Sequence, residues 1–514
     1  QAGTGDSVLE TFITKERDPE VHNQNARLGL DYQIGRQTTV GVLLSGYINQ
    51  WNLNELSNVA IRPIGASDTL IQSFNTEEND WKNLQTNLHL SHQFTSTTNL
   101  DISLDYLFYN NDNPANYDQR FSLDTGTALR QEQLFSGNQT DFGIWVAKLD
   151  YQQTFAKKGK WGNGVKYVNS DFQNRVLVTM DEVVLPNFTN NGDLLEGVYA
   201  AYTQAEYPLS DKTQVKAGLR YEFSDTDLIS DKDGQVVDRE FGEFFPSVYL
   251  NHQLTETQQI NLSYSRRINR PSFSDMASFV FFLDPNTSFS GNARLQPAIA
   301  NTIQADYRYK TINLTLQYTH EDSTIARFQN RFDPELNRQL ILPINLRDQQ
   351  IFNASIAFPW KAAKWWQMRY FVQYTHTVAT TVDEDFIDIN RQNSVFLNGN
   401  QTFTLAKNWS FELSGFWRSR QLNGNVRIDP TGVLNAGLQK KLANGSRLTL
   451  NVTDVFDSFK FNTATTIPAN NFAVERLFDF SQRTFKLTYL ASFGNNKVKK
   501  ARTYRQAEEA RRVN

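Results

Sequence analysis

The stretch that decides the fold is Phe485-Lys-Leu-Thr-Tyr-Leu-Ala-Ser-Phe493, near the C-terminal end of the chain. Apolar or aromatic side chains stand at every second position, from Phe485 through Leu487, Tyr489 and Ala491 to Phe493, and mostly polar residues lie between them. Because successive side chains of a β-strand point to opposite faces, this pattern predicts a strand with one apolar and one mostly polar face. Such a strand is typical of a membrane β-barrel.

The same alternation recurs about twenty times along the 514 residues. In one clear case, apolar residues occupy every even position from Leu100 to Phe108, and Asp101, Ser103 and Asp105 lie between them. Each such strand runs for roughly 10 to 14 residues, which is the length that a tilted strand needs to cross an apolar band about 25 Å tall. No window approaches the roughly 18 to 20 apolar residues of a membrane helix.

Composition agrees with a single barrel-like architecture. The mean hydropathy of -0.53 with 13% aromatic residues suits strands that are apolar on one face only. We find no linker rich in Pro, Gly or Ser that would divide the chain. A net charge of -4 without a clustered basic surface argues against nucleic acid as a partner. The absence of cysteine excludes disulfides and thiolate metal sites.

The connections between strands alternate between short and long. Short turns fall near residues 35–37, 95–98, 157–160, 210–212, 255–257, 310, 359–364, 406–408 and 443–446. Long polar segments lie between them, at residues 52–80, 110–140, 174–196, 224–240, 269–297 and 321–345. Membrane barrels combine short periplasmic turns with long extracellular loops, so this alternation predicts the orientation of the strands. About nine turns, one strand before them (residues 8–16) and one after (residues 477–493) predict about twenty strands, an even number that places both ends on the same side.

Tryptophan residues gather beside the short turns. Trp161, Trp360, Trp365, Trp366 and Trp409 lie within a few residues of one. Ring systems with an apolar body and a polar tip settle at the membrane–water boundary, so these positions predict an aromatic girdle. For any single tryptophan, an ordinary place in the core of a β-sandwich is the alternative.

Several segments resemble the outer-membrane β-barrel proteins of Bacteroidota, which are similar to TonB-dependent receptors. They are Leu262-Ser-Tyr-Ser-Arg-Arg-Ile-Asn-Arg-Pro-Ser-Phe273, Phe282-Leu-Asp-Pro285, Gly291-Asn-Ala-Arg-Leu-Gln-Pro297, Leu448-Thr-Leu-Asn-Val-Thr-Asp-Val-Phe-Asp457 and the closing strand that ends in Ala491-Ser-Phe-Gly494. One departure is Ala293, because the family commonly has a proline after the Gly-Asn pair.

The resemblance implies an all-β fold, an antiparallel transmembrane β-barrel of about 20–22 strands in the outer membrane. Family members usually carry a plug ahead of the barrel, and a TonB-dependent receptor barrel has 22 strands. We therefore expect residues 1–494 to form a barrel that is incomplete at its N-terminus and lacks its plug. Residues 495–514, rich in Lys and Arg, are expected to form a basic periplasmic tail that is solvated and partly disordered.

Three candidate ligand contacts fall at the end of one strand and in the loop after it. Arg267 lies in the lumen-facing register, Arg270 begins the loop and Asp284 lies within it. They could form a folded-in vestibule for a ligand. The alternative, which we favour, is a structural anchor in which arginines pair with carboxylates.

Three further candidates lie in the lumen-facing register of other strands, namely Arg369, Glu412 and Arg418. They could line a transport path, because a barrel of about twenty strands encloses space that polar side chains must fill. The alternative, which we favour, is that they hydrogen-bond a plug or one another.

We expect no metal site, cofactor or catalytic centre. The six histidines lack metal-ligand spacing, and His89 and His92, three residues apart on a strand, face opposite sides. No G-x-S-x-G motif is present. An outer-membrane enzyme, in which a serine or carboxylate would pair with a histidine in a loop cleft, stays as a third hypothesis.

The first functional hypothesis follows from the resemblance: a TonB-dependent receptor that takes up a siderophore, glycan or other nutrient. Its implied partners are outer-membrane lipid and lipopolysaccharide, the nutrient ligand, and a TonB-type energy-coupling protein reached through a missing N-terminal region. The second hypothesis is a structural or adhesive barrel whose loops bind partners without transport.

Overall fold

The computed structural model describes residues 9–63, 67–156, 158–277, 280–284, 286–333, 338–383, 386–467, 472–480, 483–491 and 508–513. These residues fold almost entirely into β-structure, as one 20-stranded sheet and two four-stranded sheets. Among them, no helix has the length and apolar character needed to cross a membrane.

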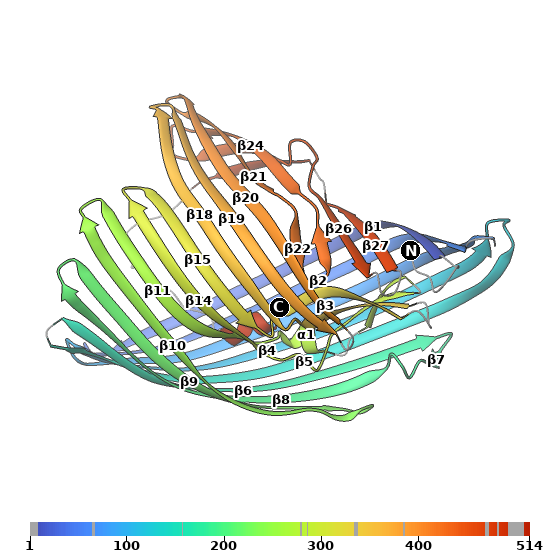
Figure 1. Cartoon of the computed structure of the whole chain (residues 1–514), viewed down its shortest axis with the longest axis horizontal. Helices are drawn as coiled ribbons and strands as arrows, with labels where there is room; N and C mark the ends of the chain where they lie inside the picture. Colours follow the sequence, from blue (N-terminus) through green and yellow to red (C-terminus); the bar gives the residue numbers. More distant parts are fainter. Residues whose placement is uncertain are drawn as a thin grey trace.

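The large sheet is antiparallel, and strands that are neighbours in the chain are neighbours in the sheet (Figure 1). Its strands are β1 (Leu9–Ile34), β2 (Thr38–Pro63), β3 (Thr69–Thr95), β4 (Thr98–Leu123), β5 (Ala128–Phe155), β6 (Gly159–Met180), β7 (Val183–Val184), β8 (Asn190–Ser210), β9 (Thr213–Ser230), β10 (Gly234–Thr255), β11 (Gln258–Asn269), β14 (Ala298–Tyr309), β15 (Ile312–Asp322), β18 (Asp348–Ala363), β19 (Trp366–Asp383), β20 (Phe386–Ala406), β21 (Trp409–Arg418), β24 (Thr431–Lys441), β25 (Arg447–Thr453) and β28 (Thr484–Leu490). Figure 1 shows the sheet curving strongly, with α1 (Phe273–Met276) and the C-terminal segment among its strands. The face that carries α1 is called the inner face below.

Eight of the nine predicted short turns are confirmed, because they lie between two consecutive strands of the large sheet, as at residues 35–37, between β1 and β2. The turn predicted at residues 359–364 is misplaced, because residues 359–363 belong to β18 and the chain turns at residues 364–365. Trp161, Trp360, Trp365 and Trp409 are exposed beside these turns. The end of the sheet that carries the short turns is called the short-turn end, and the opposite end is called the outer end.

Near the short-turn end, apolar side chains cover the outward face of the sheet. In β28, Phe485, Leu487 and Tyr489 are exposed as the alternation predicts, and in β4 Leu104 and Phe108 are exposed in the same way. We call the outward apolar side chains in this half of the sheet the apolar belt. Large apolar side chains exposed together on one face need an apolar partner, and hydrocarbon supplies it.

The apolar side of each strand changes where the strand passes beyond the apolar belt. In β4, outward positions after Phe108 are polar, and the buried side chains of Tyr109, Tyr117 and Phe121 lie on the inner face. The neighbouring strands β5 and β6 change in a similar way, whereas in β3 Leu70 and Phe74 are exposed on the outward face of the outer half. The outer half therefore packs an apolar interior against loops and exposes polar residues to water.

Four predicted long loops are instead strands, so that prediction is wrong. The flanking strands continue through most of residues 52–80, 110–140, 174–196 and 224–240, and β2, β4, β6 and β9 end at Pro63, Leu123, Met180 and Ser230. β1 to β5 are 26 to 28 residues long, about 90 Å at roughly 3.4 Å per residue. A membrane crossing needs only about 9 to 11 residues, so most of each strand extends past the bilayer.

The other long connections fold into smaller sheets. β12 (Val280–Asp284), β13 (Thr287–Ser290), β17 (Arg338–Asn345) and β16 (Ile325–Asp333) form one, with β13 and β17 parallel. β22 (Gln421–Asn423), β23 (Val426–Ile428), β26 (Lys460–Ile467) and β27 (Phe472–Asp479) form the other. The predicted strand over residues 477–493 is thus β28 together with the end of β27, and these two strands belong to different sheets.

Among the described residues, β1 and β28 are the terminal strands of the large sheet. β1 pairs with β2 alone, and β28 pairs with β25 alone. Apart from β7, a two-residue strand that pairs with β6 alone, nineteen strands form the sheet. β1 starts at the outer end, opposite Pro63, whereas β28 finishes at the short-turn end, where Leu490 pairs with Arg447. The prediction of two ends on the same side is therefore wrong.

The largest apolar core lies on the inner face. It joins buried residues of β4, β5, β6 and β8 to Phe273 and Met276 of α1 and to Ala510 and Val513 near the C-terminus. Burial of this kind is the main source of stability for a segment without a regular hydrogen-bond ladder. The connection from β11 to β14 is therefore fixed against the wall of the sheet.

Candidate functional site

A cleft of about 560 Å³ opens on the inner face beside α1. Its wall comes from β6, β8, β9, β11 and β16, from the residues after β11, and from a 3₁₀ helix near the C-terminus, η2 (Glu508–Arg512). Its charged residues are Lys166, Glu196, Arg220, Glu222, Arg266, Arg267, Arg270, Arg327, Glu508, Glu509, Arg511 and Arg512. We call this space the inner cleft. Its cationic residues outnumber its carboxylates two to one.

Glu222 of β9 links two of the arginines. Its buried carboxylate accepts hydrogen bonds from Arg220 Nε and, at 2.8 Å, from Arg270 Nη2. A buried carboxylate is tolerated only when it is paired, and two guanidinium groups satisfy this one fully. The ion pair between Arg270 and Glu222 fixes the chain to β9 where it leaves β11.

The first turn of α1 is closed by its own side chains. Ser272 Oγ accepts from the Asp275 backbone N–H at 3.1 Å, and Asp275 Oδ2 accepts from the Ser272 N–H at 3.1 Å. Arg327 of β16 donates from Nη2 to Asp275 Oδ2 at 2.6 Å and from Nε to Oδ1 at 2.8 Å. Burial alone would raise the pKa of Asp275, but the hydrogen bonds from Arg327 and Ser272 outweigh it and lower this pKa. α1 is thereby joined to the four-stranded sheet of β12, β13, β17 and β16.

The C-terminal segment differs from its prediction. Residues 508–513 lie on the inner face instead of forming a solvated tail, and Ala510 and Val513 are each 1% exposed. Lys166 Nζ donates to Glu509 Oε1 at 2.6 Å, and the Arg512 guanidinium pairs with Glu196. The charge of the segment is therefore used in specific pairs. The rest of the predicted tail, residues 495–507 and 514, falls outside the described residues.

The structure brings two of the six predicted contacts together. Arg267 and Arg270 both line the inner cleft. Asp284 lies instead at the end of β12, in the four-stranded sheet that also contains β16. Its side chain is buried there, and its Oδ1 accepts a hydrogen bond from the Asn286 N–H at 2.9 Å. Arg270 thus pairs with a carboxylate of a barrel strand, Glu222, and not with Asp284.

Asp284 is nevertheless unusual. Burial raises its pKa, and its Oδ2 has no hydrogen-bond partner among the described residues. Burial also lowers the pKa of Arg476, in β27, to about 10. Arg476 also donates from Nη2 to Asn330 Oδ1 of β16 at 3.1 Å, which links the two small sheets.

The remaining three predicted contacts lie apart from the inner cleft. Arg369 in β19 and Glu412 in β21 are exposed, and Glu412 Oε1 accepts a hydrogen bond from Asn400 Nδ2. Arg418 lies at the end of β21, with its guanidinium 5.6 Å from the centre of the Phe461 ring. These three do not form one site with Arg267 and Arg270.

Sequence reasoning missed Lys166, Glu196, Phe273 and Arg512. Lys166 and Glu196 fall on the inner-facing register of β6 and β8, which the alternation of these strands could have revealed. Arg512 lies outside every strand, so no periodic signal exists for it.

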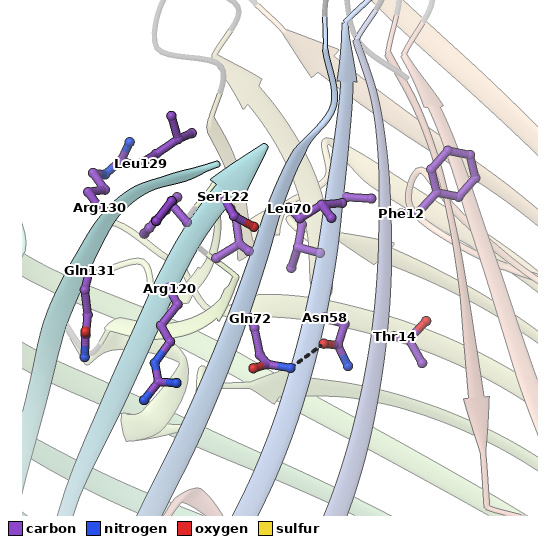
Figure 2. Close-up of a pocket in the computed structure, with 15 residues that line it drawn as sticks. Phe12, Thr14, Asn58, Leu70, Gln72, Arg120, Ser122, Leu129, Arg130 and Gln131 are labelled. Carbon is purple, nitrogen blue, oxygen red and sulfur yellow. Dashed lines mark hydrogen bonds between the residues drawn. The ribbon is translucent and has the colours of Figure 1, made fainter. Parts of the chain in front are cut away.

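A second hollow, of about 820 Å³, lies at the outer ends of β1 to β5 (Figure 2). Thr14, Asn58, Gln72, Arg120 and Gln131 form a row across its floor, each directly opposite the next in the sheet. Gln72 Nε2 donates to Asn58 Oδ1 at 3.3 Å, as drawn in Figure 2. All five side chains are exposed, on the face opposite the buried Val59, Ile71 and Phe121. This outer row is therefore separate from the inner cleft.

No group of three or more His, Asp or Glu side chains with a metal-binding arrangement occurs among the residues that the structure describes. The donors of the inner cleft are mainly guanidinium groups, which bind anions and not metal ions directly.

Solved structures of import receptors share this fold. The ferric-catecholate import receptor Fiu of E. coli K12 has a TM-score of 0.56 at 12% identity, over 95% of this chain and 82% of that chain. The copper transporter OprC has a TM-score of 0.55 at 10% identity, over 87% and 74%. The ferric yersiniabactin uptake receptor FyuA of Yersinia pestis has a TM-score of 0.53 at 10% identity, over 93% and 79%. At such identity the likeness concerns the fold alone.

No curated protein matches the chain. The family model for the outer membrane protein beta-barrel family matches residues 92–489, which is more than three quarters of the sequence. That match supports an outer-membrane location for this β-structure. The chain therefore belongs to the outer membrane protein beta-barrel family.

Proposed function

We propose that this protein is an outer-membrane receptor that takes up a small anionic ligand, such as a metal chelate, through its interior. The observation that carries the proposal is the cation-rich inner cleft, in a fold shared with receptors that import ferric chelates. A cleft of about 560 Å³ has the size of ordinary small-molecule sites. Guanidinium groups suit such a ligand because they bind carboxylate and catecholate oxygens in pairs.

Binding of a ferric tris-catecholate complex to the purified full-length protein in micelles tests this proposal. Arg267→Glu should weaken binding about tenfold or more, because it places a negative charge in the path of an anion. Binding of the unaltered protein should also weaken as salt is raised. Tryptophan fluorescence quenching measures both effects.

The matched control is Arg36→Glu, which makes the same change of charge in an exposed short turn. It should leave affinity unchanged. Equal effects of both substitutions, or a neutral analogue that binds as tightly as the anion, would refute an anion site in the inner cleft.

The alternative is an adhesive barrel without transport. The exposed outer row favours it, because hydroxyl, amide and guanidinium groups in one line can contact a surface polysaccharide. A deletion strain that keeps normal chelate uptake but loses attachment to surfaces would select the alternative over uptake.

We also propose that further strands, encoded upstream of Gln1, close the barrel. β1 and β28 both run toward the short-turn end, so an antiparallel closure needs an odd number of strands between them. Three would give the 22 strands of a TonB-dependent receptor. Unpaired edges are unfavourable in lipid, where no water satisfies the backbone. The same upstream region is where a plug and a contact for a TonB-type protein would lie.

Closure has a direct readout in gel mobility. The full-length product should migrate as a compact band in unheated SDS and shift on heating, whereas residues 1–514 alone should show no such shift. The physical reason is that only a closed backbone network resists SDS. A heat-dependent shift for residues 1–514 alone would mean that β1 and β28 close without added strands.

A further inference from the structure

The C-terminal residues 508–513 divide into three faces. Side chains three residues apart share a face in a 3₁₀ helix. Glu509 and Arg512 make one charged face, Ala510 and Val513 continue as a buried apolar face, and Glu508 and Arg511 are exposed. Such a division is typical of a segment that recognises a specific surface, and a solvated tail does not need it.

The Arg512 guanidinium is contacted by a carboxylate, a backbone carbonyl and an aromatic ring. It donates from Nη2 to Glu196 Oε2 at 3.2 Å and from Nη1 to Glu196 Oε1, and Nε donates to the Pro271 carbonyl at 3.1 Å. The guanidinium carbon lies 4.3 Å from the centre of the Phe273 ring. Glu196 itself is buried on β8. Two carboxylate oxygens, a carbonyl and an aromatic face together match a planar guanidinium and not a point charge.

In the second ion pair the charges are reversed, because here the strand supplies the cation and the segment supplies the carboxylate. Lys166, buried on β6, donates to Glu509 at 2.6 Å and to Glu508 at 3.4 Å. Ala510 and Val513 enter the inner core that contains Phe273. A buried lysine and a buried glutamate on adjacent strands thus find ionic partners in one short segment. Glu196 also has Thr226 and the charge of Arg270 near it, but the Arg512 guanidinium is the partner that pairs with its carboxylate directly.

We infer that this part of the inner face is a peptide-binding site for a segment with an acid and an arginine three residues apart, and that its occupant is residues 508–513 of the same chain. The site is defined by Lys166, Glu196, Pro271 and Phe273. The inference does not depend on the uptake proposal, because it rests on contacts with the wall alone. The docked segment also forms one side of the inner cleft, so its release widens that cleft.

Cysteine accessibility tests docking, because the chain has no cysteine of its own. In the full-length protein in micelles, Ala510→Cys should react with a small maleimide at least about tenfold more slowly than Arg511→Cys. Adding Glu196→Gln to Ala510→Cys should remove most of this protection, because Arg512 then loses its ionic partner. Equal rates for Ala510→Cys and Arg511→Cys would overturn the inference.

Glu206→Gln is the matched control. Glu206 lies on β8 ten residues from Glu196, in the same inner-facing register, and pairs with Gln214 and Lys160 near the short-turn end. It should leave the reactivity of Ala510→Cys unchanged. An equal rise with Glu206→Gln would show general loosening of the strand and would also overturn the inference.

Charge exchange keeps the test decisive if a single variant folds poorly. Lys166→Glu should expose Ala510→Cys, and the further change Glu509→Lys should restore its protection. A synthetic peptide of residues 508–513 should also bind a variant truncated after residue 507. Replacing arginine by glutamine at the position of Arg512 should weaken that binding about tenfold or more, and the same change at Arg511 should not. No rescue and no peptide binding would refute the site.

Discussion

Phe273→Ala should lower the local free energy of opening of α1 by about 3–5 kcal/mol, the usual cost of removing a buried phenylalanine ring. Phe273 is 0% exposed, and its ring centre lies 5.4 Å from that of Phe142 and 5.9 Å from that of Phe172. A helix of four residues has almost no stability of its own, so packing of this ring holds the turn in place. Hydrogen exchange in residues 273–277 should accelerate by a factor of about 100 or more.

Phe456→Ala is the control for this prediction, because Phe456 is 69% exposed and its removal creates no cavity. It should leave exchange in residues 273–277 unchanged. Exposure of residues 508–513 should rise together with that of α1 in Phe273→Ala, since Arg512 lies against the same ring. Unchanged exchange in Phe273→Ala would mean that the inner core does not hold this connection.

The alternation of side chains predicted the strands that meet the membrane, because there each face has a single environment. Phe485, Leu487 and Tyr489 are exposed on one face as expected, and eight of the nine short turns lie where a change in pattern placed them. The alternation of apolar and polar residues in a lipid-facing strand is a local sequence pattern, so one strand can be recognised without knowing its neighbours.

The outer halves of the strands escaped prediction because their pattern is inverted. In β4, Tyr109, Tyr117 and Phe121 alternate with polar residues, but they face the interior and are separated by Asn and Asp residues that suggest a loop. Tyr109 and Tyr117 share their buried clusters with Phe273 and Phe282 of the connection after β11, whereas Phe121 packs against Val59 and Ile71 of neighbouring strands. Such a partner is distant in sequence and leaves no local signal.

Two motifs that pointed to the family have plain structural causes. A Cβ on Gly291 would lie 2.1 Å from the Ala277 carbonyl oxygen, so only glycine fits where this loop turns back on α1. Asp454 accepts from the backbone N–H groups of Ser458 and Phe459 at 2.9 Å and closes the turn where the chain leaves β25. Both motifs describe loop geometry, which is why they indicated the fold and not the ligand.

The candidate site was predicted in part. Arg267 and Arg270 were expected near a ligand because they end a strand and begin a long loop, and both line the inner cleft. Glu196 and Arg512 pair across 316 positions of sequence, and neither has a local feature that identifies the other. Contacts of this kind depend on how the whole sheet curves.

Leu104→Arg should destabilise the folded protein in lipid vesicles by about 2–4 kcal/mol, the cost of an arginine on the lipid face at the bilayer midplane. Leu104 is exposed on the outward face of β4, midway through the apolar residues from Leu100 to Phe108. Urea unfolding at equilibrium measures the loss, read from the change in midpoint at constant slope.

Asn116→Arg makes the matching change outside the apolar belt. Asn116 is exposed on the same face of the same strand, twelve positions along, which is about 40 Å at roughly 3.4 Å per residue. Water reaches it there, so the same side chain should change stability by less than about 0.5 kcal/mol. The difference between the two variants isolates hydrocarbon contact from strand propensity, because both insert arginine into one strand. Equal losses of stability in the two variants would mean that lipid does not contact β4 near the short-turn end. The apolar belt would then need a protein partner instead.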